Sequence, residues 1–552
     1  MNPKDAAPNK TVRHFRQILL WPLQLMPIQE SAQIQKHWEL LERVGQDNPW
    51  HEVEDEFTGD PTQFQERHYN EFITFLPHVQ RFLYGEGKGR TSRAGAGESP
   101  IRVFRREDIA KVRMTYRQGE VPLDFDVAHV DLYFFYDIDV VVLVVEVHAD
   151  DLSLERVQDT LYRFGRAYPP FWRADGSGSS CLQRVQWLSA QAEVLATSDY
   201  ERREKYLAFV CQYRSPCIAS HWEFLLEPLV LHHSSKPGPI RYRQIEYHRM
   251  PLMAYLAIDD PRALTRTDFI RLALVTAPDG GEALPFSDRH LLGFEHSYCY
   301  DRFWSEVPGG PSTRYMSCGQ ALVVVGSAQQ DFFVGREIGV LSQFRHQHFL
   351  LYLIAHFHKA ALLMLSDRLV HALNHLDIQD PESVRRFKRT IRQSFEIFLR
   401  FTHRYWFHDI ADQAQTRDLF RMSSEHLGTE RLYGEVEDEI QKMSDYLDSD
   451  ALRRQANTVV RLTVVTTFGL IATVTTGFLG MNLIAEAEAP LILKLLYFIL
   501  IAVPATLLTL YAVLRSKRLS DFLETLSDDR LSMRAKYRAL GSIFRDRQKT
   551  SA

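Results

Sequence analysis

The sequence predicts an α+β membrane protein: an N-terminal cytosolic α/β domain, a long stalk helix and two C-terminal transmembrane helices. Residues 131–147 form a β-branched and aromatic run that is typical of a central strand buried on both faces. Residues 426–462 repeat apolar side chains at helical spacing without a proline, which indicates a continuous stalk helix. Residues 463–482 and 491–514 are apolar segments, each long enough for a helix to cross a bilayer.

Composition limits the class of protein. The chain has 552 residues and a formal net charge of -5, which gives no indication of a nucleic-acid partner. Its 5 cysteines are scattered and form no C-x-x-C pair, so neither a disulfide framework nor a thiolate zinc site is expected. Scattered, unpaired cysteines fit a protein domain in a reducing compartment better than one in an oxidising compartment. The first 30 residues lack a secretory signal, and a mitochondrial transit peptide is the less favoured alternative to ordinary structure there.

We expect residues 1–335 to form the cytosolic α/β domain. Besides the run at 131–147, shorter apolar or β-branched runs predict strands near residues 207–211, 270–276 and 321–325. These runs differ from the later part of the chain, where long apolar stretches with helical spacing dominate. The domain boundary is therefore placed near residue 335.

Flexible loops and a helical region complete the cytosolic part. Gly- and Ser-rich composition predicts the loops, near residues 85–100 and 174–180. Residues 336–425 predict a cytosolic helical region, with one helix over 338–376 and another over 381–406. Both helices precede the stalk.

The apolar centre of the first of these helices, residues 349–365, resembles a membrane span by length. His356, His358 and Lys359 lie in its middle, and ionisable side chains are costly in lipid. We therefore expect a buried helix, with a membrane span as the less favoured alternative.

The topology of the two C-terminal spans follows from the charges that flank them. Basic residues precede the first predicted span and follow the second: Arg453, Arg454, Arg461, Arg515, Lys517 and Arg518. The connecting loop, residues 483–490, carries no Lys or Arg. Basic flanks stay inside, so both chain ends, including the tail 515–552, are expected in the cytosol and the loop outside.

The first span is rich in threonine and glycine. Residues at helical steps define one stripe along it: Leu462, Thr466, Leu470, Thr473, Gly477 and Gly480. Small and hydroxyl side chains allow close helix packing, and they also suit the lining of a polar pore. Two helices cannot enclose a pore, so the pore interpretation requires an oligomer around a symmetry axis.

Gly480, Met481 and Asn482 close this first span. In this setting of a stalk helix, two C-terminal spans, a short loop and a basic tail, the tripeptide resembles the signature of the CorA family of divalent-cation transporters. The resemblance covers about residues 425–520. It implies a homopentamer in the inner (plasma) membrane, with the first span of each subunit around a central pore.

The resemblance also assigns roles. Asn482 would hold the hydrated ion at the extracellular mouth, Gly480 would permit the turn, and Val459 would be a bulky gate residue. Leu462 and Leu470 match hydrophobic constrictions, which gate by dewetting. The expected pore-lining residues are Asn457, Val459, Leu462, Thr466, Leu470, Thr473 and Gly477. Asn457 lies one residue away from the position at which the family has an asparagine at the cytosolic entrance.

The loop after the tripeptide departs from the family, whose usual Met-Pro-Glu-Leu is missing. Glu486 and Glu488 would still form an acidic mouth that concentrates cations. The expected cargo is Mg²⁺, which keeps its hydration shell tightly and suits neutral oxygen ligands, and the departure leaves Zn²⁺, Co²⁺ or Ni²⁺ as alternatives. No cofactor is expected beyond the transported ion, which could also regulate the channel.

Two further clusters contain side chains of the kinds that bind metals. Glu435, Asp438, Asp445 and Asp448 line one side of the stalk, where a solvated face is favoured over a regulatory metal site between subunits. His371 and His375 have the four-residue spacing of a metal-ligand pair, but no third ligand is evident, so a surface or partly buried pair is favoured.

No G-x-S-x-G motif, no paired catalytic carboxylates with a supporting context and no nucleotide fingerprint occur in the sequence, so we do not expect an enzyme. The alternative to transport is a membrane-anchored regulatory or scaffold protein whose helical hairpin only tethers it. The threonine- and glycine-rich stripe favours the channel over this alternative.

Overall fold

The computed structural model describes residues 10–28, 36–45, 48–53, 66–85, 100–246, 249–278, 283–377, 380–480, 490–493, 495, 496, 499, 500, 503, 504 and 507. The chain divides into two units, Met1–Ile440 and Gln441–Ala552. The first unit is a mixed α+β structure with one large sheet and long helices, so the predicted α+β class is confirmed at this level.

The sheet has 14 strands, whose main order is β12-β13-β14-β11-β1-β6-β5-β4-β7-β8. The first seven are β1 (Thr11–Leu25), β2 (Trp50–Glu52), β3 (Ile101–Arg106), β4 (Lys111–Thr115), β5 (Leu123–Phe135), β6 (Ile138–Ser153) and β7 (Arg184–Leu188). The others are β8 (Val194–Thr197), β9 (Leu229–Leu231), β10 (Ile240–Gln244), β11 (Leu252–Ile258), β12 (Cys299–Tyr300), β13 (Arg314–Ser317) and β14 (Ala321–Ser327). Off the main path, β10 pairs with β1 and β9, and β3 pairs with β2 and β5.

The helices of the described residues number fifteen by their labels, and the last six, α10 to α15, follow the last strand. The short ones are α1 (His37–Glu42), α2 (Glu66–Thr74), α3 (Pro77–Tyr84), α4 (Leu154–Arg163), α5 (Arg203–Tyr213), α6 (Ser220–Leu226), α7 (Arg266–Leu274), α8 (Asp288–Leu291), α9 (Phe294–Tyr298), α10 (Asp331–Val334) and α11 (Val340–Arg345). The long ones are α12 (Gln347–Asn374), α13 (Pro381–Arg404), α14 (Ala414–Leu427) and α15 (Thr429–Gly480).

Strands β1 and β6 form the centre of the sheet and pair antiparallel from Thr11 opposite Ser153 to Gln24 opposite Val140. The run from Val140 to Val145 is at most 3% exposed, so the strand predicted to be covered on both faces is confirmed. Its β-branched side chains alternate between the two faces, as a strand requires.

The domain differs from a parallel α/β fold. Among the described strands only β11–β14 and β9–β10 pair in parallel, and the remaining pairs are antiparallel. The strand predicted near residues 321–325 is β14, but the runs at 207–211 and 270–276 lie in α5 and α7, so those two strand predictions were wrong. Short apolar runs do not distinguish strand from helix, and at α7 a capping box between Thr265 and Asp268 starts the helix.

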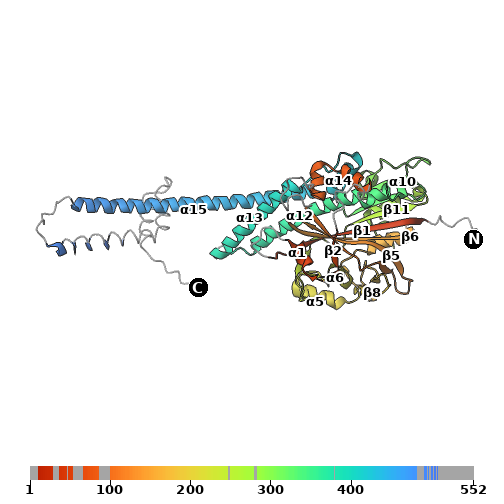
Figure 1. Ribbon diagram of the computed structural model, residues 1–552, viewed down its shortest axis with the longest axis horizontal. Helices are drawn as coiled ribbons and strands as arrows, with labels where there is room; N and C mark the ends of the chain where they lie inside the picture. The colour runs from red at the N-terminus through yellow and green to blue at the C-terminus, as the bar shows by residue number, and fades with distance from the viewer. Residues whose placement is uncertain are drawn as a thin grey trace, which may run out of the picture. The chain divides into compact units, whose positions relative to one another are not determined.

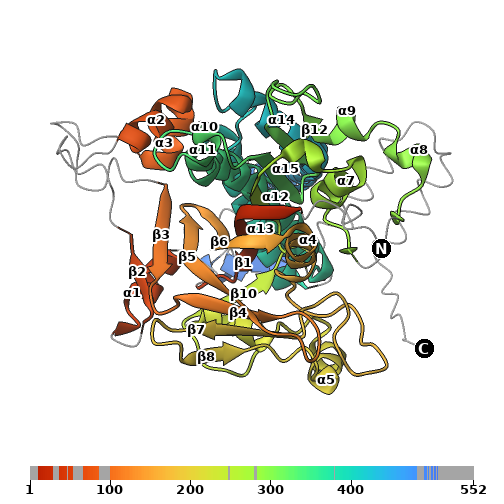
Figure 2. The same ribbon diagram turned by 90° about the vertical axis from the view of Figure 1, so that its right-hand side faces the viewer.

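Two helical layers cover the central strands. On one face α12 packs against β1 and β6, and on the other α4 packs against the same two strands, with α6 beside them (Figures 1 and 2). Phe357 of α12 stacks on Phe135 of β5 at 3.9 Å between ring centroids. On the opposite face Trp21 of β1 meets Trp222 of α6 edge to face at 6.3 Å. The aromatic contacts tie each layer to the sheet.

The expected helical region is part of the same unit as the sheet. The helix predicted over 338–376 is observed as α11 and α12, and the helix over 381–406 as α13. Among the described residues one segment, Val340–Asn374, is long and apolar enough to cross a membrane, and 78% of its most apolar window is buried inside the protein. This burial agrees with the prediction of a core helix.

In the second unit, α15 continues without interruption to Gly480, as predicted for the stalk and first span. The predicted stalk starts at 426, whereas α14 ends at Leu427 and Gly428, with a left-handed φ of 66°, separates it from α15. The loop 483–490 and the second span 491–514 lie mostly outside the described residues, where positions 491–493, 495 and 496 are helical. The two-span topology therefore stays a prediction.

Candidate functional site

The predicted pore-lining stripe lies on α15. Val459 and Leu462 are 58% and 63% exposed within the single chain, and Thr466, Thr473 and Gly477 are exposed as well. The backbone at Asn457 and Leu470 is helical, but their side chains lie outside what the structure describes. Large apolar side chains exposed along a helix need another surface, either lipid or a neighbouring subunit.

The threonines of this helix satisfy their own hydroxyl donors. Thr463 donates to the carbonyl of Val459 at 2.9 Å, and Thr473 donates to the carbonyl of Gly469 at 2.8 Å. Thr466 repeats this pattern one turn further, with a bond of 2.9 Å to the carbonyl of Thr463. A hydroxyl group that donates in this way can also accept a hydrogen bond. A helix of this kind fits an apolar surrounding, because its hydroxyl donors find acceptors on its own backbone.

The residues expected at the extracellular mouth, Met481, Asn482, Glu486 and Glu488, lie outside the described residues. Gly480 is the last described residue of α15. The predicted selectivity tripeptide is thus described only at its glycine.

The stalk acids Glu435, Asp438 and Asp445 are exposed, and the side chain of Asp448 lies outside the described part of the helix. Asp445 accepts a hydrogen bond from Gln441 at 2.9 Å, and Glu435 lies 3.5 Å from Arg431. Within the described residues no group of three His, Cys, Asp or Glu side chains is arranged to hold a metal ion. In the single chain these acids form a solvated face, which agrees with the favoured interpretation.

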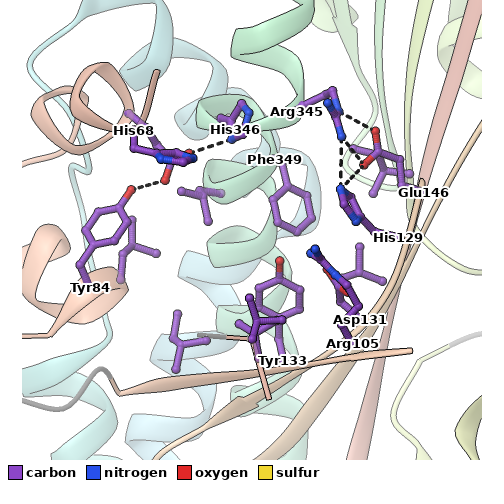
Figure 3. A pocket seen from close by; sticks show the side chains of 18 of the residues that line it. His68, Tyr84, Arg105, His129, Asp131, Tyr133, Glu146, Arg345, His346 and Phe349 are labelled. Carbon is purple, nitrogen blue, oxygen red and sulfur yellow. Dashed lines mark hydrogen bonds and ion pairs between the residues drawn. The ribbon is translucent and has the colours of Figure 1, made fainter. Parts of the chain in front are cut away.

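A pocket of about 350 Å³ lies in the first unit, where the sheet meets α2, α11 and the start of α12 (Figure 3). Its walls carry ionisable side chains from elements far apart in the sequence. Arg105 and Asp131 come from the sheet, and Arg345, His346 and Phe349 come from the helices. Figure 3 shows these side chains turned toward one another around the cavity.

Glu146 of β6 is the central charge of this pocket. It is 5% exposed and accepts hydrogen bonds from Arg16 at 2.5 Å and Arg345 at 2.8 Å, and His129 lies 3.9 Å away. Although burial acts in the opposite direction, the two guanidinium groups lower the pKa of Glu146 to about 2. The carboxylate is therefore a permanent anion that joins β1, β6 and α11, and it does not serve as a general base near neutral pH.

The other carboxylates of the pocket are paired too. Asp131 accepts two hydrogen bonds from Arg105 at 2.8 and 2.9 Å. Glu71 accepts one from the Tyr84 hydroxyl at 2.5 Å and lies 3.0 Å from His346 Nδ1. Each of the three carboxylates among the described lining residues, Glu71, Asp131 and Glu146, therefore has a hydrogen-bond or ion-pair partner. The ion pair between Arg345 and Glu146 connects α11 to the sheet at this pocket.

Sequence reasoning missed this network. The one signal was Glu146 itself, an acid inside an otherwise apolar strand, because a buried carboxylate requires a cationic partner. Its partners Arg16 and Arg345 lie 130 and 199 positions away, a distance across which sequence spacing carries no information.

Comparison of the chain with protein-family models, with curated proteins and with solved structures finds no match.

Proposed function

We propose that this chain is one subunit of an oligomeric channel for divalent metal cations in the inner (plasma) membrane, similar to the CorA family. Mg²⁺ is the expected ion, with Zn²⁺, Co²⁺ and Ni²⁺ as alternatives. The observation that carries the proposal is the unbroken helix α15, which leads from acidic turns into the charge-free run ending at Gly480, Met481 and Asn482.

Two properties of α15 support this role. Its apolar side chains at Leu452, Val459 and Leu462 are 67%, 58% and 63% exposed, which suits packing against other subunits or lipid. The hydroxyls of Thr466 and Thr473 donate to carbonyls of their own helix, and a hydroxyl oxygen that donates once can still accept a hydrogen bond from water. A symmetric ring of such helices would surround a narrow path lined by hydroxyl oxygens and interrupted by apolar side chains.

In this mechanism the ion crosses with much of its water shell. Mg²⁺ dehydrates reluctantly, so the Asn482 side-chain carbonyl and the threonine oxygens would act on the bound waters. Glu486 and Glu488 would raise the local cation concentration at the mouth. The homopentameric state, the two-span topology and the cytosolic position of both chain ends belong to the same proposal.

The test is metal-dependent flux through the purified protein in lipid vesicles, with Mg²⁺, Zn²⁺, Co²⁺ and Ni²⁺ compared. Asn482→Ala is expected to abolish flux while the oligomer still assembles, as measured by light scattering. Full flux through the assembled variant would contradict the assigned role of Asn482. No flux of any ion through the native protein would favour a membrane-anchored scaffold.

Topology is tested separately by cysteine labelling of intact cells. A cysteine at Glu486 should react with an impermeant reagent from outside, and a cysteine at Ser520 should react only after the membrane is opened. The opposite pattern would reverse the orientation of the proposed pore.

A further inference from the structure

A second cavity, of about 570 Å³, lies in the first unit between α12, α13 and the ends of β1 and β10. Its lining holds four arginines and three histidines against two aspartates. Arg368 and His371 come from α12, Arg386 and Arg389 from α13, and Arg243 from β10. Together with His232, which follows β9, four separate stretches of chain thus bring basic side chains to one place.

The two aspartates neutralise only part of this charge. Asp139 is paired with Arg368, and Asp367 is paired with Arg243. The side chains of Arg386 and Arg389, both exposed, have no ion-pair partner within the described residues. Two guanidinium groups on the α13 wall are therefore available to a ligand.

Two histidines of the lining lie close together, and the basic groups around them affect one another. The rings of His371 and His375 are 4.2 Å apart between centroids. Burial together with His375 and Arg243 lowers the pKa of His371, and burial together with Arg368 lowers the pKa of Arg243. His232 has a buried Nδ1 that makes no hydrogen bond in the described structure. An anion in the cavity would be attracted by the arginines and would offer His232 an acceptor.

The same charges exclude a metal cation. His371 and His375 have metal-ligand spacing, but the neighbouring arginines would repel a divalent ion. Within the described residues no third His, Cys, Asp or Glu completes a coordination group. The sequence-based interpretation of His371 and His375 as a surface or partly buried pair stays a prediction.

One wall of the cavity is apolar. Apolar side chains from the end of β1, from α12 and from α13 contribute to it: Met26, Pro27, Ala372, Phe387 and Ile397. Phe387 and Ile397 are 6% and 4% exposed, so they form a fixed surface. A ligand that fills this cavity has a charged end and an apolar body.

We propose that the cavity binds a soluble organic polyphosphate, a molecule with two or more phosphates on a flat apolar body, for which a nucleoside triphosphate is the simplest example. Guanidinium groups bind phosphate oxygens in pairs through parallel hydrogen bonds, and several such groups select for more than one phosphate. The volume falls in the range of about 300–1,000 Å³ that small-molecule sites occupy. This site lies within the first unit, and the inference does not depend on ion transport.

The experiment measures binding of adenosine triphosphate to the full-length protein in detergent, by calorimetry, with a chelator present to remove divalent ions. The native protein is expected to bind it saturably. The double variant Arg386→Ala with Arg389→Ala should weaken binding at least about tenfold, because two charge-assisted contacts are lost. The matched control, Arg385→Ala with Arg392→Ala, removes the same charge from positions of α13 outside the cavity and should leave affinity unchanged.

Four comparisons decide the outcome. An equal loss of affinity in both double variants would mean non-specific attraction and would overturn the proposal, as would the absence of saturable binding. Inorganic tripolyphosphate should bind more weakly than adenosine triphosphate, and equal affinity would remove the apolar wall from the site. Binding to vesicles that contain phosphoinositides, without binding of the soluble nucleotide, would assign the phosphate to a lipid headgroup and overturn the soluble ligand.

Discussion

Helices α12 and α15 are both long and have apolar segments, yet the apolar side chains are buried in α12 and exposed in α15. In α12 the side chains of Leu353, Ile354 and Phe357 are 0% exposed and pack between the sheet and the neighbouring helices. In α15, by contrast, Val459 and Leu462 are 58% and 63% exposed. The apolar side chains of α12 pack against other parts of the same chain, whereas those of α15 have no such packing at Val459 and Leu462.

The difference shows what distinguishes a core helix from a candidate membrane helix. Inside α12, His356 donates to the carbonyl of Gly319 at 3.1 Å and His358 donates to the carbonyl of Tyr405 at 2.5 Å. Ionisable side chains that bond to distant backbone indicate a packed protein interior. Residues 463–480 of α15 carry no ionisable group, and their threonines bond within their own helix. Hydropathy alone does not separate these two cases.

The largest expected effect is acid destabilisation of the α12 core. Burial lowers the pKa of His348 to about 4 and the pKa values of His356 and His358 to about 3. Because the unfolded state binds protons first, stability is complete above pH 6.5 and falls as the pH decreases toward 3, by up to about 1.4 kcal/mol per pH unit for each histidine. Denaturant unfolding at pH 7, 6 and 5 measures this. A free energy of unfolding that stays constant over this range would contradict neutral, buried histidines.

Next in size is Phe357→Ala, which removes the ring that stacks on Phe135. Loss of a fully buried aromatic ring should lower the free energy of unfolding by about 3–5 kcal/mol. Leu373→Ala is the matched control, because Leu373 lies on the same helix and is 53% exposed. Equal losses in the two variants would mean that α12 is not packed as described.

A smaller effect is expected for His358→Leu. The change keeps an apolar side chain of similar size but leaves the carbonyl of Tyr405 without its donor, at a cost of about 1–3 kcal/mol at pH 7. The variant should also show a shallower decrease of stability between pH 6.5 and 4, since one titrating group is gone. An unchanged pH dependence of stability would show that His358 does not contribute to the destabilisation by acid.

The smallest effect on folding is expected in α15. Leu462→Ala should change the free energy of unfolding of the α+β unit by less than about 0.5 kcal/mol, because the side chain is exposed within one chain. Under the proposed function it should nevertheless change ion flux, as a constriction of the pore would. Denaturation and vesicle flux measure the two effects on the same variant. A large loss of stability with normal flux would mean that Leu462 is packed within the chain, as the side chains of α12 are, and does not line a pore.

Several elements were predictable because their physics is local. The strand through Val140–Val145 follows from a continuous β-branched run, and the continuous α15 follows from helical spacing without a proline. The short apolar runs at residues 207–211 and 270–276 were predicted wrongly as strands, because such runs fit either structure and the flanking residues decide between them.

The sequence by itself determined the α+β class, the burial of the helix that contains His356 and His358, and the length of α15. The tertiary structure alone decided the antiparallel sheet with β1 at its centre, the charge network of Glu146, and the arginine cluster around Arg243 and Arg386. The physical reason is range. Periodicity and caps act over a few residues, whereas Arg345 meets Glu146 and α13 meets β10 only after the sheet has assembled and brought distant charges to one surface.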